Sequence, residues 1–304
     1  MAVTLRTLRM EELDAWYALC GQLFEVGPLY FRRHFETDPW ADVGGIFVAE
    51  DAGRLVSSVR VFTRYLMLEG CPQLTGGIGE VCTLPEYRGQ GISGRLLTMA
   101  EAYMSERGMH LRALYGVLTS HYGRHGFAPV QTFYRRVPLE SLPELSGAQR
   151  VRAFEGADLP AAQGLYDLYM GQFPLSFWRG ESAYWERWVL SEWKETLVLE
   201  ENGRVAAYAD VHVEDGVLKV QDAACVPGEE ASLYALLGEA ARRLSASQVE
   251  GPEPVLSGAC GERVKEHTGH LMLAVSGTVC GLTDVRGVEE LAAERIVQWQ
   301  VDGF

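Results

Sequence analysis

The chain has 304 residues, of which 47% are hydrophobic and 22% charged. This is enough apolar material for two globular domains of about 150 residues each. Lys and Arg number 27 against 41 Asp and Glu, which gives a formal net charge of -14. Such acidity argues against binding to nucleic acid or to an anionic membrane surface, because phosphate contacts require clustered Lys and Arg.

The six cysteines are scattered, with no CxxC pair and no histidine at metal-ligand spacing. They predict reduced, mostly buried thiols and no metal site. The first residues contain no long apolar run, and no stretch approaches the roughly 18 apolar residues of a membrane-spanning helix. We therefore expect a cytoplasmic protein without a membrane partner.

In chain order, the first part of the sequence alternates strand and helix patterns. Apolar residues at helical spacing predict a helix at 11–24, and β-rich segments at 46–50 and 55–68 meet at a hairpin signal, Asp51-Ala52-Gly53. The other expected elements are strands at 3–8, 78–84, 111–115 and 127–137, a helix from about 91 to 107, and a helical turn at 120–125.

Residues 141–150 (SLPELSGAQR) are rich in turn formers and predict a linker. We therefore expect a first domain at 1–140 and a second domain at 151–304. The second domain repeats the earlier pattern, with expected helices at 158–173 and 229–244 and expected strands at 197–200, 205–213 and 217–220.

Segments 47–61 and 197–211 can be laid over each other without a gap. Five residues of the first segment recur 150 positions later: Val48, Glu50, Gly53, Arg54 and Val61 correspond to Val198, Glu200, Gly203, Arg204 and Val211. Recurrence at one register, within the same order of elements, predicts two copies of one fold.

The most informative segment is EVCTLPEYRGQGISGRLL, residues 80–97. A strand ends near Leu84, and the run from Arg88 to Gly94 leads into a helix. Glycines at this place leave the unpaired amides of the helix start open to an anion, and Arg88 adds donors suited to phosphate. No Lys-Ser or Lys-Thr follows as in a Walker loop, and the loop does not follow the first strand of its unit as a dinucleotide fingerprint does.

The Arg-Gly-Gln-Gly-Ile-Ser run, after Pro85-Glu86-Tyr87 and before Leu96-Leu97, resembles motif A of the GCN5-related N-acetyltransferases (GNAT). The usual form is Arg/Gln-x-x-Gly-x-Gly/Ala, and Ser93 departs from it at the last position with a side chain small enough to admit a phosphate. Segment 120–127 (SHYGRHGF) is similar to the tandem-domain branch that includes the enhanced-intracellular-survival acetyltransferases, without their third domain.

The resemblance covers about residues 3–137 and implies tandem α/β (α+β) domains of the GNAT fold. Each domain would hold a mixed, mostly antiparallel sheet flanked by helices, and acetyl-CoA would be the co-substrate. The resemblance also implies roles for individual residues. Amides of Val81, Cys82 and Thr83 would pair with the pantetheine arm, and Tyr122 would protonate the departing thiolate. The pyrophosphate would lie on Arg88, Gly89, Gln90, Gly91, Ile92, Ser93 and Gly94.

The general base stays open between Glu80, a water chain and the C-terminal carboxylate of Phe304. Strand alternation does not decide which way Glu80 faces, because a bulge would change the parity. His121 and His125 flank Tyr122 and could relay protons. Cys82 lies beside the expected thioester, but the sequence supplies no base to activate it, so we interpret it as a small buried residue.

In the second half the loop is replaced by Gly228-Glu229-Glu230, whose carboxylates would repel a pyrophosphate. We expect a degenerate, structural copy that walls the substrate cleft, with one or two of Trp178, Trp185, Trp188 and Trp193 at a pocket. The sequence thus predicts an N-acetyltransferase acting by direct attack of an amine, from a small molecule or a peptide and cationic in keeping with the acidic chain. Alternatives are a non-catalytic acetyl-CoA sensor or regulatory protein, and a misinterpreted NAD-dependent oxidoreductase. A homo-oligomer stays open.

Overall fold

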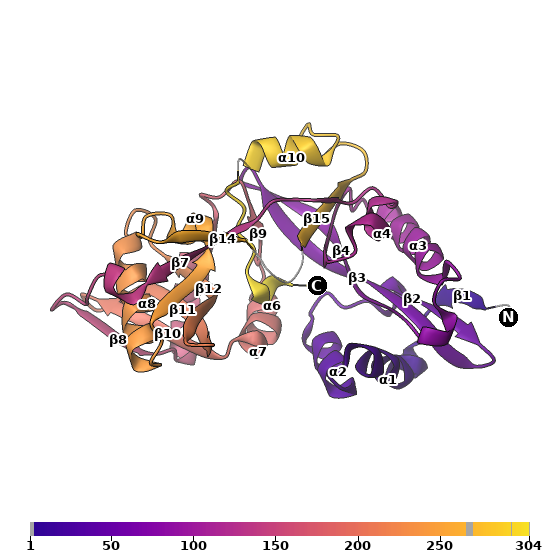
Figure 1. The fold of residues 1–304 in the computed structure, drawn as a ribbon, viewed down its shortest axis with the longest axis horizontal. Helices are drawn as coiled ribbons and strands as arrows, with labels where there is room; N and C mark the ends of the chain where they lie inside the picture. Colours follow the sequence, from indigo (N-terminus) through magenta and orange to yellow (C-terminus); the bar gives the residue numbers. More distant parts are fainter. Residues whose placement is uncertain (1–2, 266–269, 293, 304) are drawn as a thin grey trace.

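The computed structural model describes residues 3–265, 270–292 and 294–303. Two β-sheets, one of eight strands and one of seven, stand next to each other with helices packed against them (Figure 1). Two pairs of neighbouring strands are parallel, β4 with β5 and β12 with β13, and the other pairings between the named strands are antiparallel. The predicted fold class, two mixed and mostly antiparallel sheets flanked by helices, is confirmed.

The first sheet has the strand order β1-β2-β3-β4-β5-β15-β6. Helices α1 and α2 lie on one side of it and α3 on the other (Figure 1). The elements of this part are β1 (Thr4–Thr7), α1 (Leu13–Phe24), α2 (Pro28–Thr37), β2 (Ile46–Asp51), β3 (Arg54–Leu68), β4 (Cys71–Thr83), α3 (Ile92–Glu106), β5 (Leu111–Gly116), α4 (Thr119–Gly123) and β6 (Ala128–Pro129). Two strands from later in the chain complete this sheet, β9 (Leu175–Phe177) and β15 (His270–Val275).

The second sheet has the order β14-β7-β13-β12-β11-β10-β8. Its strands are β7 (Phe133–Pro138), β8 (Gln149–Ala153), β10 (Glu195–Glu201), β11 (Arg204–Glu214), β12 (Val217–Cys225), β13 (Gln248–Pro252) and β14 (Glu262–Lys265). The remaining helical elements are α5 (Leu159–Met170), α6 (Ser182–Tyr184), a π-helical turn (Trp185–Val189), α7 (Leu190–Glu192), α8 (Glu230–Arg243), α9 (Glu253–Leu256) and α10 (Val285–Ala292).

The two parts exchange strands, which the expected division at residues 140 and 151 did not anticipate. The strand expected at 127–137 is two strands, β6 in the first sheet and β7 in the second. In return, β15 inserts between β5 and β6, and β9 pairs with the end of β3. A local pattern reports that a segment is a strand, but its partner is set by side-chain packing in the assembled sheet. Sheet membership therefore does not follow the boundaries 1–140 and 151–304.

The two hairpins that the sequence repeat covers have the same pairing. Ala49 faces Ser57 in β2–β3 and Leu199 faces Ala207 in β10–β11, and both ladders shift register directly after these pairs. An ion-pair cluster also recurs at equivalent places. Arg6 contacts Glu12 and Glu50 in the first part, and Arg152 contacts Asp158 and Glu200 in the second.

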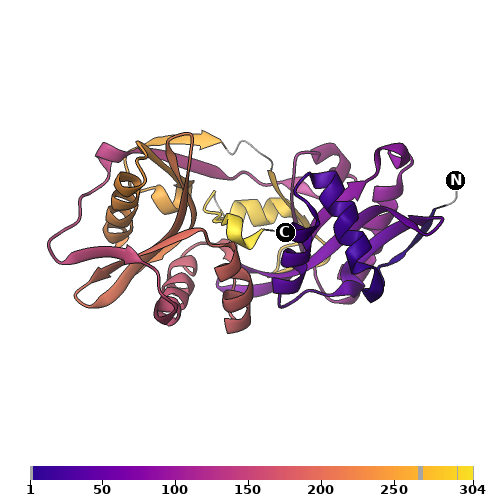
Figure 2. The ribbon, with the colours of Figure 1, turned by 90° about the horizontal axis from the view of Figure 1, so that it is seen from below.

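The last described residues lie between the two sheets rather than at the edge of the second one. They include a 3₁₀ turn at Gln300–Asp302, and Figures 1 and 2 place this turn between the two halves in both views. Among the helices of the described residues, none is both long enough and apolar enough to cross a lipid bilayer.

Candidate active site

The site is built where strands β4 and β5 stop pairing. Their parallel ladder runs only from Thr75 opposite Leu111 to Ile78 opposite Leu114, although β4 continues to Thr83. On its other edge β4 bulges, because its pairing with β3 passes directly from Gly79 to Cys82. Glu80, inside the bulge, has a left-handed backbone with φ of 52°. A bulge of this kind redirects side chains and ends regular pairing, which leaves an opening beside β4.

A cavity of about 470 Å³ occupies this opening. Most of the residues that the sequence assigned to acetyl-CoA line it, whereas Gln90 and Gly94 are not among its lining residues. The assigned residues that line the cavity are Val81, Cys82, Thr83, Arg88, Gly89, Gly91, Ile92, Ser93 and Tyr122. The other lining residues are Leu23, Phe24, Tyr87, Leu118 and His121. One cavity is therefore lined by residues that we expected to contact the thioester, residues that we expected to contact the phosphates, and the expected general acid.

The loop before α3 exposes a set of backbone amides. Gly89 and Gly91 have positive φ values of 75° and 70°, and no other group would contact a Cβ atom at either position. Glycine is therefore required here by backbone conformation rather than by crowding. The first amide of α3 bonded to the loop is that of Arg95, which donates to the Gly91 carbonyl at 3.2 Å. Amides before it in the first turn have no partner within the helix and suit a phosphate group.

Arg88 adds positive charge at the same loop. Its Nε donates to the carbonyl of Thr83 at 3.0 Å, which ties the loop to the end of β4 while the side chain stays exposed. A guanidinium has further donors in a fork that matches phosphate oxygens. The loop and Arg88 together fit the pyrophosphate of coenzyme A.

Tyr122 enters the cavity from the short helix α4. Its ring lies against Gly116, where a Cβ atom would come within 3.1 Å of the ring, and its carbonyl accepts a hydrogen bond from the Phe127 amide at 3.3 Å. Burial raises the pKa of the Tyr122 phenol above its usual value, so the hydroxyl stays protonated at neutral pH. A protonated phenol is the form that a general acid needs.

The two histidines near Tyr122 differ in their surroundings. His121 lines the cavity, and burial, assisted by the neighbouring His125 and Arg124, lowers its pKa. The ring of His125 instead hydrogen bonds to Glu101 on α3 at 2.7 Å. His121 is therefore the one of the pair that faces the site.

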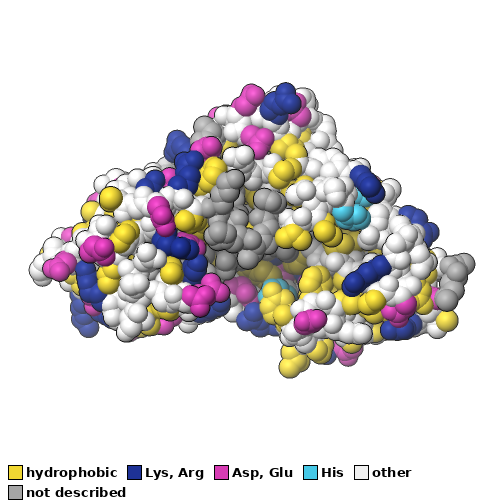
Figure 3. All heavy atoms as spheres, viewed as in Figure 1, with side chains coloured by type: hydrophobic (Ala, Val, Ile, Leu, Met, Phe, Trp, Pro, Cys, Tyr) yellow, Lys and Arg dark blue, Asp and Glu magenta, His cyan; other side chains and the backbone are white. Residues whose placement is uncertain are grey.

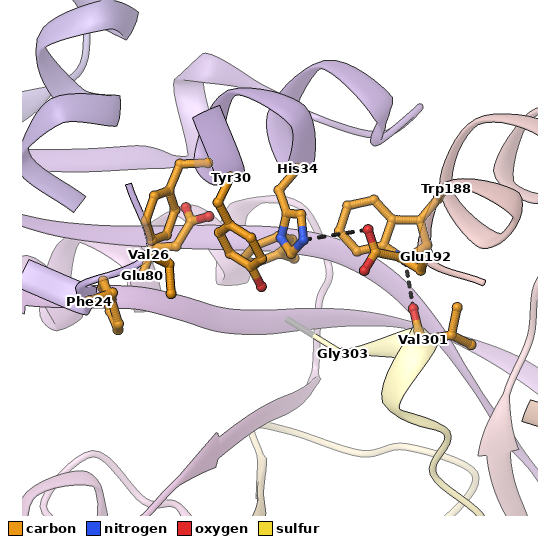
Figure 4. A pocket seen from close by; sticks show the side chains of 11 residues that line it. Phe24, Val26, Tyr30, His34, Glu80, Trp188, Glu192, Val301 and Gly303 are labelled. Carbon is orange, nitrogen blue, oxygen red and sulfur yellow. Dashed lines mark hydrogen bonds and ion pairs between the residues drawn. The ribbon is translucent and has the colours of Figure 1, made fainter. Parts of the chain in front are cut away.

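A second cavity, of about 320 Å³, lies between the two halves of the chain and includes Glu80 of the β4 bulge in its lining (Figure 4). Glu80 lines the second cavity, the adjacent Val81 lines the first, and Phe24 lines both. The other lining residues come from α2 and the loop before it, from β3, from the segment before β10 and from the C-terminal turn. They are Val26, Tyr30, Phe31, His34, Phe62, Trp188, Glu192, Val301 and Gly303.

Glu80 is a buried carboxylate with one oxygen free. Its Oε1 accepts from Arg60 at 3.3 Å, whereas Oε2 has no hydrogen-bond partner among the described residues. Burial raises the pKa of Glu80 above its usual value, against the opposing effect of Arg60. A carboxylate with a raised pKa is a stronger base, and Glu80 is one of the residues that line the second cavity.

The C-terminal turn is fastened to the second half by buried charges. Asp302 receives two hydrogen bonds from Arg179, at 2.8 Å and 2.7 Å, and Trp188 donates to the Val301 carbonyl at 2.7 Å. These contacts hold Val301 and Gly303 in the wall of the second cavity. Phe304, whose carboxylate the sequence suggested as a base, lies outside the described residues.

In the second half, the loop at Gly228–Glu230 carries two acidic side chains that make local hydrogen bonds and ion pairs. The amide of Gly228 donates to Glu230 at 3.0 Å, and Glu229 pairs with Arg204 at 2.9 Å. The amide that a phosphate would need is thus already bonded to a carboxylate from the same loop.

Sequence reasoning missed several residues of the second cavity. Tyr30 and His34 lie on α2, a helix that the sequence analysis did not anticipate although Pro28 stands at its first turn, a common start signal. Glu192 lies on α7 of the other half, and only its position next to the tryptophan cluster could have drawn attention to it. Trp188, a member of that cluster, does line the cavity.

Residues 4–130 match the sequence profile of the acetyltransferase (GNAT) domain family. A mycothiol acetyltransferase of Thermobispora bispora is 36% identical over 125 residues, a match that covers 37% of this chain and 40% of that protein. The chain therefore carries a GNAT acetyltransferase domain at residues 4–130, and its match spans less than half of the curated relative.

Solved structures share the fold over most of the chain. A GCN5-related N-acetyltransferase from Anabaena variabilis superposes with a TM-score of 0.73 at 13% identity, covering 90% of this chain and 73% of that one. Eis1 from Mycobacterium abscessus gives a TM-score of 0.64 at 15% identity, with the same coverage of 90% and 73%. At these identities the likeness concerns the fold, which extends well beyond the matched domain.

Proposed function

We propose that the protein is an N-acetyltransferase that moves an acetyl group from acetyl-CoA to an amine by direct attack. The observation that carries the proposal is that adjacent residues of the β4 bulge, Glu80 and Val81, line two different cavities, and that Phe24 lines both. One holds the exposed amides, Arg88 and Tyr122, and the other holds Glu80. A thioester in the first cavity would be open to an amine in the second.

In the proposed reaction the amine nitrogen attacks the thioester carbonyl carbon, so that a C–N bond forms and the C–S bond breaks. Glu80 accepts the proton that the nitrogen loses, and the Tyr122 hydroxyl donates a proton to the departing sulfur. The products are an N-acetyl amide and the free thiol of coenzyme A. Water returns the proton to Tyr122 and removes the one on Glu80, so both groups are restored for the next turnover.

The second half has a structural role in this proposal. Its loop at Gly228–Glu230 is closed by carboxylates, and it contributes Trp188, Glu192 and the C-terminal turn to the wall of the acceptor cavity. We infer one coenzyme site per chain, with the degenerate copy completing the acceptor site.

A screen of amines with acetyl-CoA, scored by release of free thiol and by mass of the product, tests the proposed activity. We expect at least one amine to yield thiol and acetylated product in equal amounts. Calorimetric binding of coenzyme A without thiol release from any amine would favour the alternative, a non-catalytic acetyl-CoA sensor. Tighter binding of NAD than of coenzyme A would contradict both.

A further inference from the structure

The acceptor cavity is rich in hydrogen-bond acceptors and poor in positive charge. Its charged side chains are Glu80 and Glu192, and its described lining includes no Lys or Arg. His34 lies between them in Figure 4, and its Nε2 is 3.5 Å from the Oε1 of Glu192. An amine can donate to such groups, whereas a carboxylate or phosphate would be desolvated next to two carboxylates.

Glu192 is ionised but already has a cation of its own. Burial acts to raise its pKa, but the nearby His34 and Arg33 lower it below the usual value. Arg33 donates to Glu192 Oε1 at 2.8 Å, and the His34 Nε2 lies 3.5 Å from the same oxygen. Because Arg33 already pairs with Glu192, this end of the cavity offers no strong site for a second positive charge, and the Glu192 carboxylate occupies the place at which an anion would bind Arg33.

The rest of the lining is apolar and largely aromatic. Phe24, Tyr30 and Val26 form its rim and are 44%, 41% and 53% exposed. Phe62 and Trp188 are buried deeper in the wall. Figure 3 shows hydrophobic side chains gathered on both sides of the hollow in this part of the surface. Aromatic faces bind both apolar groups and amine cations.

We propose that the acceptor is a small amine with a single positive charge, an apolar and preferably aromatic body, and no carboxylate or phosphate. The ammonium would lose one proton to water to become the attacking amine, this end would reach Glu80, which accepts the second proton, and the body would lie against Tyr30 and Trp188, with Glu192 excluding anions. The cavity of about 320 Å³ is at the lower end of the usual range for ligand sites, about 300–1,000 Å³. This inference rests on the proposed acetyl transfer and adds the class of acceptor to it.

The test compares 2-phenylethylamine with phenylalanine, which adds a carboxylate to the same body, and with spermidine, which adds positive charges. We expect kcat/KM for 2-phenylethylamine to exceed that for each of the others by at least about 100-fold, a ratio within reach of a site that leaves a charge unpaired. Glu192→Gln should lower the ratio of kcat/KM for 2-phenylethylamine to kcat/KM for phenylalanine by about tenfold. Glu186→Gln, the same charge change at an exposed residue outside the cavity, should leave it unchanged.

Tyr30→Ala tests the aromatic wall, and Leu29→Ala is its matched control because Leu29 is 75% exposed and does not line the cavity. We expect Tyr30→Ala alone to lower kcat/KM for 2-phenylethylamine, by about tenfold. Equal or better use of phenylalanine or spermidine by the unaltered protein would overturn the inference while leaving acetyl transfer intact.

A separate measurement distinguishes the failure of the inference from the failure of the proposed activity. If no amine releases thiol, 2-phenylethylamine is titrated by calorimetry into the protein saturated with coenzyme A. Binding that Tyr30→Ala weakens and Leu29→Ala does not would support the acceptor class, with only the activity rejected. No binding of 2-phenylethylamine would overturn the acceptor class itself.

Discussion

At the scale of single residues, Tyr122 is the group whose proposed role depends on one atom. Its ring is packed against Gly116, so Tyr122→Phe should keep the packing and remove only the hydroxyl. We expect turnover to fall by about 10²–10⁴-fold, the usual contribution of a positioned general acid. kcat and kcat/KM should fall together, and acetyl-CoA affinity, measured by calorimetry, should be nearly unchanged.

His121→Ala is the comparison for Tyr122→Phe, since His121 lines the same cavity, and we expect a much smaller loss. Near-normal turnover of Tyr122→Phe in a single-turnover experiment would remove Tyr122 from the mechanism. The single-turnover form is necessary because slow product release would conceal a change in the chemical step.

Glu80 should leave a signature in the pH dependence. As a base it must be ionised, so kcat should fall as the pH drops through its pKa, which burial raises above the usual value for Glu. Glu80→Gln should lower kcat by about 10²–10⁴-fold and abolish this acidic limb. Glu86→Gln, at an exposed carboxylate outside both cavities, should retain it. An unchanged limb in Glu80→Gln would assign it to another group, such as the acceptor amine.

At the scale of elements, the phosphate site depends on the first turn of α3. Ser93→Glu would place a carboxylate among the exposed amides without the backbone strain that any side chain meets at Gly91, where φ is 70°. We expect coenzyme A binding to be lost, because each charge-assisted hydrogen bond to the pyrophosphate is worth about 1.5–3 kcal/mol.

Thr98→Glu controls for added charge on the same helix, since Thr98 is exposed and outside the cavity. It should bind coenzyme A with at most a small loss. Normal affinity in a folded Ser93→Glu protein, as judged by circular dichroism, would place the phosphate site elsewhere.

How far the sequence predicted these elements depended on whether a local pattern carries the information. The loop from Arg88 to Gly94 and its helix follow from glycines and spacing within one short segment, and the structure begins α3 at Ile92 as that pattern implies. The direction of Glu80 did not follow, because a bulge changes which face a residue takes and alternation cannot detect it. The exchange of strands through β7 and β15 could not be predicted either, because the residues of a strand do not determine which strand it pairs with.

At the scale of the whole molecule, the two halves of the chain should not bind coenzyme A equally. The amide of Gly228 is already bonded to Glu230, whereas the corresponding loop of the first half keeps its amides open. We expect calorimetry to give one coenzyme A per chain, and the Ser93→Glu protein to bind none. Two equivalent sites per chain would contradict the view of the second half as a degenerate copy.

The whole molecule also depends on the fastening of its C-terminal turn. Arg179 lies between Asp222 and Asp302, all three fully buried, and reaches Asp222 at 2.7 Å. Removing one partner of a buried ion pair typically costs about 3–5 kcal/mol, because the other charge stays buried. We therefore expect Asp302→Ala to lower the free energy of unfolding in urea by about that amount. Glu229→Ala, which breaks the exposed pair with Arg204, should cost at most about 1 kcal/mol.

Asp302→Ala should also affect binding of the acceptor without affecting binding of coenzyme A. Val301 and Gly303 line the acceptor cavity but not the coenzyme cavity, so loss of the Asp302 contacts should raise KM for the acceptor and leave the Kd of coenzyme A unchanged. If Asp302→Ala does not fold, Asp302→Asn, which keeps the shape and one accepting oxygen, provides a milder form of the same test. An acceptor KM that stays constant in a folded, destabilised variant would show that the turn supports the fold alone. A coenzyme Kd that weakens in parallel would instead show that the two cavities cannot be perturbed separately.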